Sequence, residues 1–337
     1  MTLEEMLVNA KDHRASDLLI MVGDSPAMRV AGVWRRFELP MYKPADVEAI
    51  ALQLLGPEGM DKLRQQREAD FSHNVPPAGR IRCNVHYQRD HLAMVLRLVW
   101  PEIPTPEKLG VPAQVIAQVE APTGLILVAG PTGSGKSTTL AAMIEHINQN
   151  RAAHVITVED PIEFMYSNKR AIIEQREIGS DTRTWHNALR SVLRQAPDVI
   201  LLGELRDLES IQIALLAAET GHLVMGSVHA STATGAVARI ADVFPSNQLG
   251  QVRLQLSQNL RMIFAQRLIP GRAAETRVLL YETLVNTPAV ANLIRAGELE
   301  QIPNMIAAGR EHGMISFAQC QRELLSRGAI APDFAGR

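Results

Sequence analysis

The sequence predicts an α/β protein of two domains, in which a small α+β domain precedes a larger domain built on a parallel sheet. Three observations predict this class. Short runs of alternating polar and apolar residues fill the first 100 residues, prolines crowd the next few positions, and wholly apolar runs then alternate with helical stretches. Alternating runs favour antiparallel strands with one solvated face, whereas strands that are apolar on both faces favour a parallel sheet covered by helices.

The first domain is predicted over residues 1–100. Its short strands are separated by Pro, Gly and Asp, and a helix over residues 46–55 is entered through Pro44. The strands are expected at residues 16–21, 27–30, 33–37, 80–87 and 91–99. Short strands with one helix in a segment of this length are typical of an α+β domain with a mostly antiparallel sheet.

A proline-rich linker is predicted over residues 101–112. The segment 100–106 holds three prolines in seven positions. Proline fixes φ and lacks the backbone N–H group, so this stretch suits neither a helix nor a central strand. An extended connection of this kind is expected to join the two domains without adding a packed interface between them.

The second domain is predicted over residues 113–337. An apolar run at residues 125–129 leads into a Gly-rich turn and then a helix over residues 137–148. Further strands are expected at residues 154–158, 199–202 and 223–228, with helices between them and a mostly helical tail over residues 290–327. Strands that alternate with helices predict a parallel sheet.

The composition is that of an ordinary globular chain, with 46% hydrophobic and 21% charged residues. Lys and Arg number 34 against 36 Asp and Glu, and the net charge of −2 argues against a dedicated DNA-binding protein. The two cysteines, Cys83 and Cys320, are too few for a four-thiolate zinc site, so no zinc is expected. No apolar run reaches the roughly 18–20 residues that cross a bilayer, and the first turn, with Glu4 and Glu5, does not resemble a secretory signal. A cytoplasmic protein is expected.

The strongest motif is GPTGSGKS at residues 130–137, which fits the eight-position phosphate-loop pattern between a predicted strand and a predicted helix. Glycines let the backbone N–H groups turn toward an anion, and the following helix adds its positive dipole end. In this pattern the lysine reaches the β- and γ-phosphates of ATP and the serine hydroxyl is a ligand for Mg²⁺. The residues expected to bind the nucleotide are Gly130, Pro131, Thr132, Gly133, Ser134, Gly135, Lys136, Ser137 and Thr138.

Acidic residues follow two of the predicted strands. One strand runs into Glu159, Asp160 and, three residues later, Glu163, and another runs into Glu204. Open parallel sheets bind ligands beyond the carboxyl ends of their strands, so these side chains are expected near the phosphate loop. One acid would support Mg²⁺ and another would orient the attacking water. Each acid, taken alone, is also compatible with capping the next helix.

Two histidines, His222 and His229, bracket the apolar run at residues 223–228. We interpret them as candidate sensors of the γ-phosphate, with His229 at the carboxyl end of the strand. A catalytic or sensing histidine there would link loss of phosphate to movement of the strand and the loop after it. Structural hydrogen bonding remains the alternative, and it is as good an interpretation for His222.

Four segments occur in the order and spacing of a known family. They are GPTGSGKSTT from residue 130, VEDPIEF from residue 158, DVILLGELRD from residue 198 and TGHLVMGSVH from residue 220. Together they resemble the ATPases of type II and type IV secretion and, within these, the PilT-type ATPases that retract type IV pili. Residues 15–18, 28–30, 80–84 and 290–298 are also similar to that family, so the resemblance covers nearly the whole chain.

The resemblance implies a PAS-like N-terminal domain, a RecA-like P-loop ATPase domain with a helical tail, and a homo-hexamer that hydrolyses ATP with Mg²⁺ to drive pilus retraction. It implies an inner-membrane platform protein of the PilC type as partner, a position at the inner membrane through that partner, and a paralogous retraction ATPase as a further partner. Within the site, Glu163 matches the family's water-activating carboxylate, and Glu204 matches the acid that supports Mg²⁺ together with Ser137. Arg82 and Arg97 correspond to N-terminal arginines that reach the nucleotide, where positive charge neutralises the transition state.

The chain departs from the family pattern at Leu19, where many relatives have histidine, and in the segment from Ser227 to Ala230, where threonines are usual. These departures leave open an accessory retraction ATPase of the PilU type. A pilus-assembly or type II secretion ATPase fits less well, because many of those carry a four-cysteine zinc module. A nucleic-acid motor needs a basic track lined with aromatic side chains, and aromatic residues are only 4% of the chain. A switch that only binds nucleotide would lack an acid, yet Glu163 and Glu204 are both present.

Overall fold

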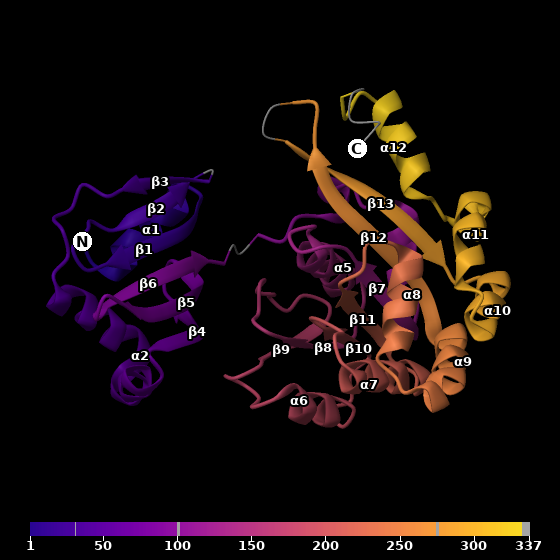
Figure 1. Ribbon diagram of the computed structural model, residues 1–337, viewed down its shortest axis with the longest axis horizontal. Helices are drawn as coiled ribbons and strands as arrows, with labels where there is room; N and C mark the ends of the chain where they lie inside the picture. Colours follow the sequence, from indigo (N-terminus) through magenta and orange to yellow (C-terminus); the bar gives the residue numbers. More distant parts are fainter. Residues whose placement is uncertain (31, 100–101, 274–275, 332–337) are drawn as a thin grey trace. The chain divides into compact units, whose positions relative to one another are not determined.

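A computed structural model describes the chain except for residues 31, 100–101, 274–275 and 332–337 (Figure 1). The chain divides into two compact units, Met1–Glu102 and Ile103–Arg337. We refer to them as unit 1 and unit 2. Pro101, with which the predicted linker begins, and Trp100 before it lie outside the described residues.

Unit 1 is built on a six-stranded sheet in the order β3-β2-β1-β6-β5-β4, and each pair of neighbouring strands is antiparallel. Its elements are α1 (Leu3–Asp12), β1 (Ala15–Met21), β2 (Ala27–Val30), β3 (Val33–Arg36), α2 (Pro44–Gln66), β4 (Glu68–Val75), β5 (Gly79–Gln88) and β6 (His91–Leu98). Both helices pack on one sheet face, because alternate residues such as Leu18 and Ile20 of β1 join the same core as Leu7 of α1 and Val47 of α2.

The predicted elements of unit 1 are present, but two others were missed. Strand β4 was not predicted because it is mostly polar and lies at the edge of the sheet, where no apolar alternation is required. Helix α1 is short and opens with a capping box between Thr2 and Glu5. The predicted end of the second helix, at Leu55, is where the chain departs from helical geometry at Gly56, after which α2 resumes through Pro57 to Gln66.

Unit 2 contains a seven-stranded sheet in the order β13-β12-β7-β11-β10-β8-β9, parallel throughout except for the pair β12–β13. Its strands are β7 (Gly124–Ala129), β8 (His154–Glu159), β9 (Ile172–Glu177), β10 (Val199–Leu202), β11 (Leu223–Val228), β12 (Leu260–Pro270) and β13 (Arg277–Val285). Its α-helices are α3 (Pro106–Leu109), α4 (Ala113–Val119), α5 (Lys136–Asn150), α6 (Trp185–Val192), α7 (Leu208–Glu219), α8 (Ala233–Asp242), α9 (Leu249–Asn259), α10 (Pro288–Ala296), α11 (Ile302–Ala308) and α12 (Phe317–Ser326).

Helices cover both faces of the unit 2 sheet (Figure 1). Ile126 and Val128 of β7 pack with α4 and α5 on one face, whereas Leu125 and Leu127 pack with α6 to α9 on the other. Every residue of β7, β10 and β11 is buried, which is why those strands are apolar without alternation. The predicted parallel sheet is therefore present, and β9, β12 and β13 add to it.

The structure corrects the far end of the predicted linker. Residues from Ile103 onward belong to unit 2, and Pro106 begins the helix α3, with the Thr105 side chain accepting a hydrogen bond from the Lys108 N–H group. Proline is compatible with the first position of a helix, where its missing N–H group has no intrahelical partner. Val111 is buried in the core that contains α5, so residues 103–112 do not form a free extended connection.

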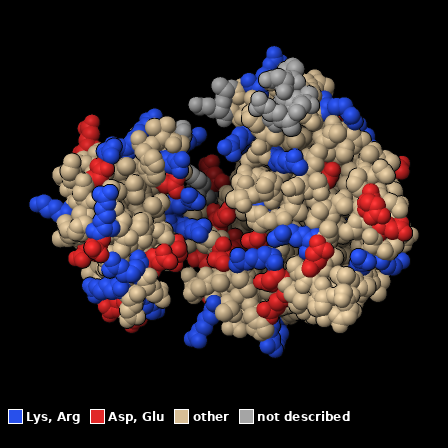
Figure 2. All heavy atoms as spheres, in the orientation of Figure 1, with Lys and Arg blue, Asp and Glu red and all other residues tan. Residues whose placement is uncertain are grey.

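Charged side chains of both signs are interspersed over the face of each unit that Figure 2 shows. Among the described residues, no helix is both long and apolar enough to cross a membrane. The expectation that the chain binds no nucleic acid stays a prediction.

Candidate functional site

The phosphate loop, residues 130–135, connects β7 to α5, so the strand and the helix that the motif requires are both present. A side chain at Gly130 would place its Cβ 2.5 Å from the Gln266 carbonyl oxygen, and Gly135 precedes α5 at φ +86°. Only glycine fits both positions without displacing its neighbours. Pro131, Thr132 and Gly133 are exposed at the tip of the loop, whereas Ser137 and Thr138 are partly buried in the first turn of α5.

Lys136 lies over the phosphate loop. Its buried side chain donates from Nζ to the carbonyl oxygens of Gly130 and Pro131, each at 3.0 Å. Burial lowers the pKa of Lys136, while the charges of Glu204 and Glu163 act to raise it. Because such interactions weaken with distance, the two acids predicted from separate strands lie around the same ammonium group.

Gln266 supports the phosphate loop from β12. The Gln266 side chain is 1% exposed, and its Nε2 donates to the Ser134 carbonyl oxygen at 2.6 Å. Sequence analysis missed Gln266 because 132 positions separate it from Ser134. The one available signal was a polar residue directly after the apolar run MIFA, at residues 262–265.

The candidate residues lie at the carboxyl ends of four neighbouring strands, which run parallel to one another in the order β7-β11-β10-β8. The phosphate loop follows β7, His229 follows β11, Glu204 follows β10, and Glu159 ends β8. The carboxyl ends of parallel strands form the usual ligand-binding edge of an α/β sheet. The fold thus gathers residues that are up to about a hundred positions apart in the chain.

Glu204 and His229 lie next to each other, with His229 Nε2 3.6 Å from Glu204 Oε1. The turn that carries Glu204 is tied to β11, because the Ser227 hydroxyl donates to the Gly203 carbonyl oxygen at 2.5 Å and Leu205 N–H donates to the Ser227 carbonyl oxygen at 2.9 Å. Ser227, which begins one of the two departures from the family pattern, therefore anchors the turn next to the histidine.

The structure places His222 away from the phosphate loop. This residue precedes β11, at the end of the strand opposite His229, and six strand residues separate them by roughly 20 Å. His222 Nδ1 lies 2.9 Å from the Ala217 carbonyl oxygen and 3.3 Å from Thr220 Oγ1, at the end of α7. These contacts fit the structural alternative for His222, and its role as a sensor stays a prediction.

Glu159 occupies a desolvated position at the end of β8. Its Oε1 accepts a hydrogen bond from the Thr157 hydroxyl at 2.7 Å, and its carboxylate also accepts one from the Glu163 backbone N–H group. Burial raises the pKa of Glu159 to about 7, although these hydrogen bonds act to lower it. The neighbouring Asp160 instead pairs with Arg206 at 3.5 Å.

We predict that Glu159 makes stability fall with rising pH. The folded-state pKa of about 7 exceeds the ordinary value of 4.5, so the folded chain binds the proton more tightly than the unfolded chain. The stabilisation is complete below the ordinary pKa and is lost as pH rises through about 7. Glu159→Gln removes this titration and should gain thermal stability relative to the unsubstituted chain as pH is raised from about 5 to about 8. Parallel melting-temperature profiles of the two proteins would contradict this.

Glu163 lies in the exposed segment between β8 and β9. Arg82 and Arg97 belong to unit 1, where they are direct partners across the antiparallel pair β5–β6 and so share one face of the sheet. Arg97 Nε donates to Oδ1 of the buried Asp17 at 2.9 Å, which fixes the orientation of its side chain. The predicted pair of arginines is thus adjacent, and its contact with a nucleotide stays a prediction.

The chain matches the family model described as "Type II/IV secretion system protein" over residues 106–324. It is 40% identical to the type IV pilus retraction ATPase PilT of Pseudomonas aeruginosa, over 99% of this chain and 97% of the relative. It is 37% identical to the type IV pilus ATPase PilU of the same organism, over 98% of this chain and 86% of the relative.

A crystal structure of the pilus retraction motor PilT with bound ADP superimposes with a TM-score of 0.93 at 42% identity. The match covers 100% of this chain and 96% of that one. The likeness extends over both units and confirms the predicted α/β fold class.

Proposed function

The chain belongs to the PilT-type retraction ATPases of the type II/IV secretion family, and from this membership we propose that it is an ATP-hydrolysing motor that drives the retraction of type IV pili. The observation that carries the proposal is the likeness to a retraction motor over the whole chain. The shared ATPase core alone would not separate retraction from secretion.

ATP binds with its phosphates in the phosphate loop. Backbone N–H groups of residues 132–138, which include the amino end of α5, face the phosphate oxygens, and the Lys136 ammonium exchanges its two carbonyl partners for the β- and γ-phosphates. Both partners lie in the loop itself, so the lysine side chain is already held at the site before nucleotide arrives. This arrangement limits the entropy that binding must remove.

Mg²⁺ fits the donor set present. Ser137 offers a hydroxyl in the first turn of α5, and Glu204 offers a carboxylate near Lys136. Mg²⁺ takes oxygen ligands and usually holds few from the protein beside phosphate and water. When bound, the ion supplies positive charge that stabilises the phosphate oxygens during transfer. No cluster of three or more His, Cys, Asp or Glu exists in the described part of unit 1 or unit 2 that would hold a metal by itself.

Glu163 orients and polarises the attacking water, and Glu204 supports the ion. His229, 3.6 Å from Glu204, senses the γ-phosphate and transmits its loss to β11. Arg82 and Arg97 supply positive charge toward the nucleotide. We further propose a homo-hexamer that acts in the cytoplasm on an inner-membrane platform protein of the PilC type, with a paralogous retraction ATPase as a further partner.

We expect deletion of the gene in its host to leave cells with excess surface pili and no twitching motility. Retraction removes pilin from the surface, so its loss leaves pili extended. The measurement is a count of surface pili by electron microscopy together with a motility assay. Complementation with the unsubstituted gene should restore both phenotypes. Cells without pili would contradict the proposal and would indicate an assembly motor.

The second candidate is an accessory retraction ATPase of the PilU type, favoured by the 37% identity over 98% of this chain. The same deletion separates the two. An accessory motor acts beside a main motor, so its loss should leave measurable retraction, whereas loss of the main motor should abolish it.

A further inference from the structure

The segment at residues 160–171 carries Glu163 and forms neither helix nor strand. Backbone N–H and C=O groups in such a segment need partners that regular structure does not provide. Here polar side chains from neighbouring elements provide them. Two of them lie at different distances from Glu163, and we call them the near anchor (Gln175) and the far anchor (Asn148).

The near anchor is Gln175, in β9. Its Nε2 donates to the Phe164 carbonyl oxygen at 2.7 Å, and its Oε1 accepts from the Tyr166 N–H group at 3.0 Å. One side-chain amide thus satisfies two backbone groups within three residues of Glu163. Such a two-point contact fixes the direction of the backbone as well as its position.

A second residue of β9 holds the other side of Glu163. The Ile162 N–H group donates to Glu177 Oε2 at 2.9 Å, and Gln175 Nε2 also donates to Glu159 Oε1 at 3.4 Å. The backbone is therefore held immediately before Glu163 by Glu177 and immediately after it by Gln175.

The near anchor lies in the same sheet as the strands that lead to the other candidate residues. Gln175 is in register with Thr157 of β8, and β8 pairs with β10, which leads to Glu204. Strands in a hydrogen-bonded sheet hold their spacing more firmly than an irregular segment does. Gln175 therefore connects the backbone next to Glu163 to the same sheet that positions Glu204.

We infer that Gln175 is a positioning residue for ATP hydrolysis, which holds Glu163 where its carboxylate can orient the attacking water. The inference rests on the proposed function of Glu163. It follows from the hydrogen bonds on both sides of Glu163, and it assigns Gln175 no contact with the nucleotide. Displacement of a catalytic group by about 1 Å can lower the rate on the order of 10²-fold.

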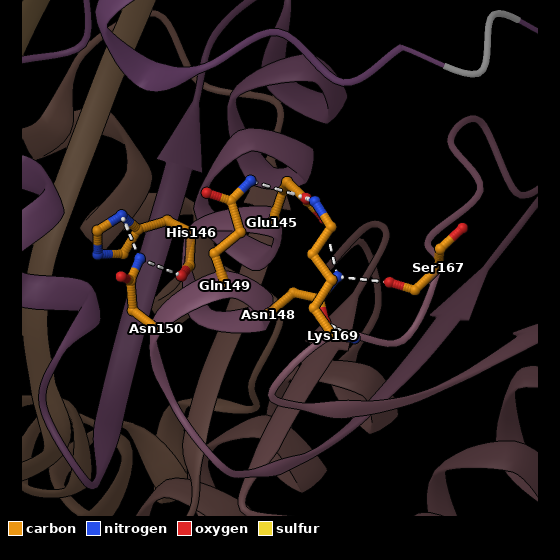
Figure 3. Close-up of polar contacts among 7 residues, drawn as sticks. All are labelled: Glu145, His146, Asn148, Gln149, Asn150, Ser167 and Lys169. Atoms are coloured by element: carbon orange, nitrogen blue, oxygen red, sulfur yellow. Dashed lines mark hydrogen bonds and ion pairs between the residues drawn. The ribbon is translucent and has the colours of Figure 1, made fainter.

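The far anchor is Asn148, in α5 (Figure 3). Its fully buried side chain donates from Nδ2 to the Ser167 carbonyl oxygen at 2.9 Å, and its Oδ1 accepts from the Lys169 N–H group at 3.0 Å. Glu145 completes the cluster with a hydrogen bond to Asn148 and an ion pair with Lys169. These contacts lie beyond Tyr166 and none reaches the residues next to Glu163, which makes Asn148 a matched control.

The experiment compares Gln175→Met with Asn148→Ala in the full chain. Methionine keeps the length of the side chain but forms neither hydrogen bond. We expect Gln175→Met to lower kcat about 10- to 100-fold, with the Kd for a fluorescent ATP analogue changed less than about threefold, because Lys136 and the phosphate loop are unaltered. Asn148→Ala should lower the melting temperature at least as much, yet change kcat less than about threefold below that temperature.

Two further variants keep the outcome interpretable. Where Gln175→Met does not fold, Gln175→Glu retains side-chain length and the acceptor for Tyr166 N–H, and should show the same loss of kcat at unchanged affinity. Glu163→Gln tests the proposed function on its own, and we expect it to bind ATP and to hydrolyse almost none.

The possible results separate the two hypotheses. A Gln175→Met protein with kcat within about twofold of the unsubstituted chain, beside an inactive Glu163→Gln protein, would overturn the inference and leave the proposed function standing. Equal losses of kcat in the Gln175 and Asn148 variants at equal melting temperature would also overturn it, since both residues would then act through stability alone. Full activity of Glu163→Gln would overturn both.

Discussion

Replacement of Lys136 by alanine is expected to abolish ATP turnover, with a loss on the order of 10³-fold or more in kcat/KM. Lys136 is buried over the phosphate loop and donates to the carbonyl oxygens of Gly130 and Pro131, where phosphate oxygens would be bound. An ammonium group in a partly desolvated site interacts with phosphate far more strongly than it would in water. Alanine leaves the loop without this charge, so both binding and hydrolysis should fail.

The measurement is calorimetric titration with ATP and Mg²⁺, followed by a steady-state assay of phosphate release. Lys169→Ala is the matched control, because Lys169 lies in the same unit but forms an exposed ion pair with Glu145. Surface ion pairs contribute little to stability, so this control should bind and hydrolyse ATP at close to the unsubstituted level. ATP affinity unchanged in Lys136→Ala would contradict the assignment of the phosphate loop.

Local sequence was sufficient for the phosphate loop, because every requirement of that motif lies within a few residues. Gly130 and Gly135 are needed by close approach and by a positive φ, and both appear in the eight-residue pattern. The acidic residues at strand ends could also be predicted, since a parallel sheet brings its carboxyl ends to one edge. The charges of Glu204 and Glu163 both act to raise the pKa of Lys136, in agreement with that expectation.

Residues that act through distant partners could not be predicted in this way. Gln266 meets Ser134 across 132 positions, and Gln175 and Asn148 act by satisfying backbone groups of a segment whose shape the sequence does not reveal. Nothing in a lone glutamine or asparagine says which carbonyl it will contact. For His222 the sequence showed its place before the strand, but it did not show the hydrogen-bond partners that the side chain finds at the end of α7.

Edge elements were missed for a related reason. Strands β4 and β9 lie at the ends of their sheets and keep polar residues, because each has a partner on one side only. Of the strands next to them, β8 is mostly buried and apolar and β5 alternates apolar with polar residues, and both were found. The predicted linker extended too far because its prolines suggested an extended chain, whereas Pro106 occupies the first turn of a helix that packs in unit 2.

The Glu204→Gln variant is expected to bind ATP normally and to hydrolyse it on the order of 10²- to 10³-fold more slowly. Glutamine preserves the size of the side chain and the turn that Ser227 anchors, so nucleotide affinity should hold. The variant loses one negative charge next to Lys136 and His229, and with it the oxygen donor proposed for Mg²⁺. Binding by titration and turnover by phosphate release, measured on the same preparation, separate the two effects.

Glu209→Gln is the control for this prediction, because Glu209 lies five residues further along the same segment and pairs with His186 on the surface rather than with the phosphate loop. Its turnover should stay within about twofold of the unsubstituted chain. The comparison with Lys136→Ala separates nucleotide binding from hydrolysis. Loss of the lysine should remove binding, whereas loss of the carboxylate should leave a protein that is saturated with ATP and inactive. Unchanged turnover in Glu204→Gln would refute the role of Glu204, and lost binding would show that the carboxylate acts in the ground state as well as during hydrolysis.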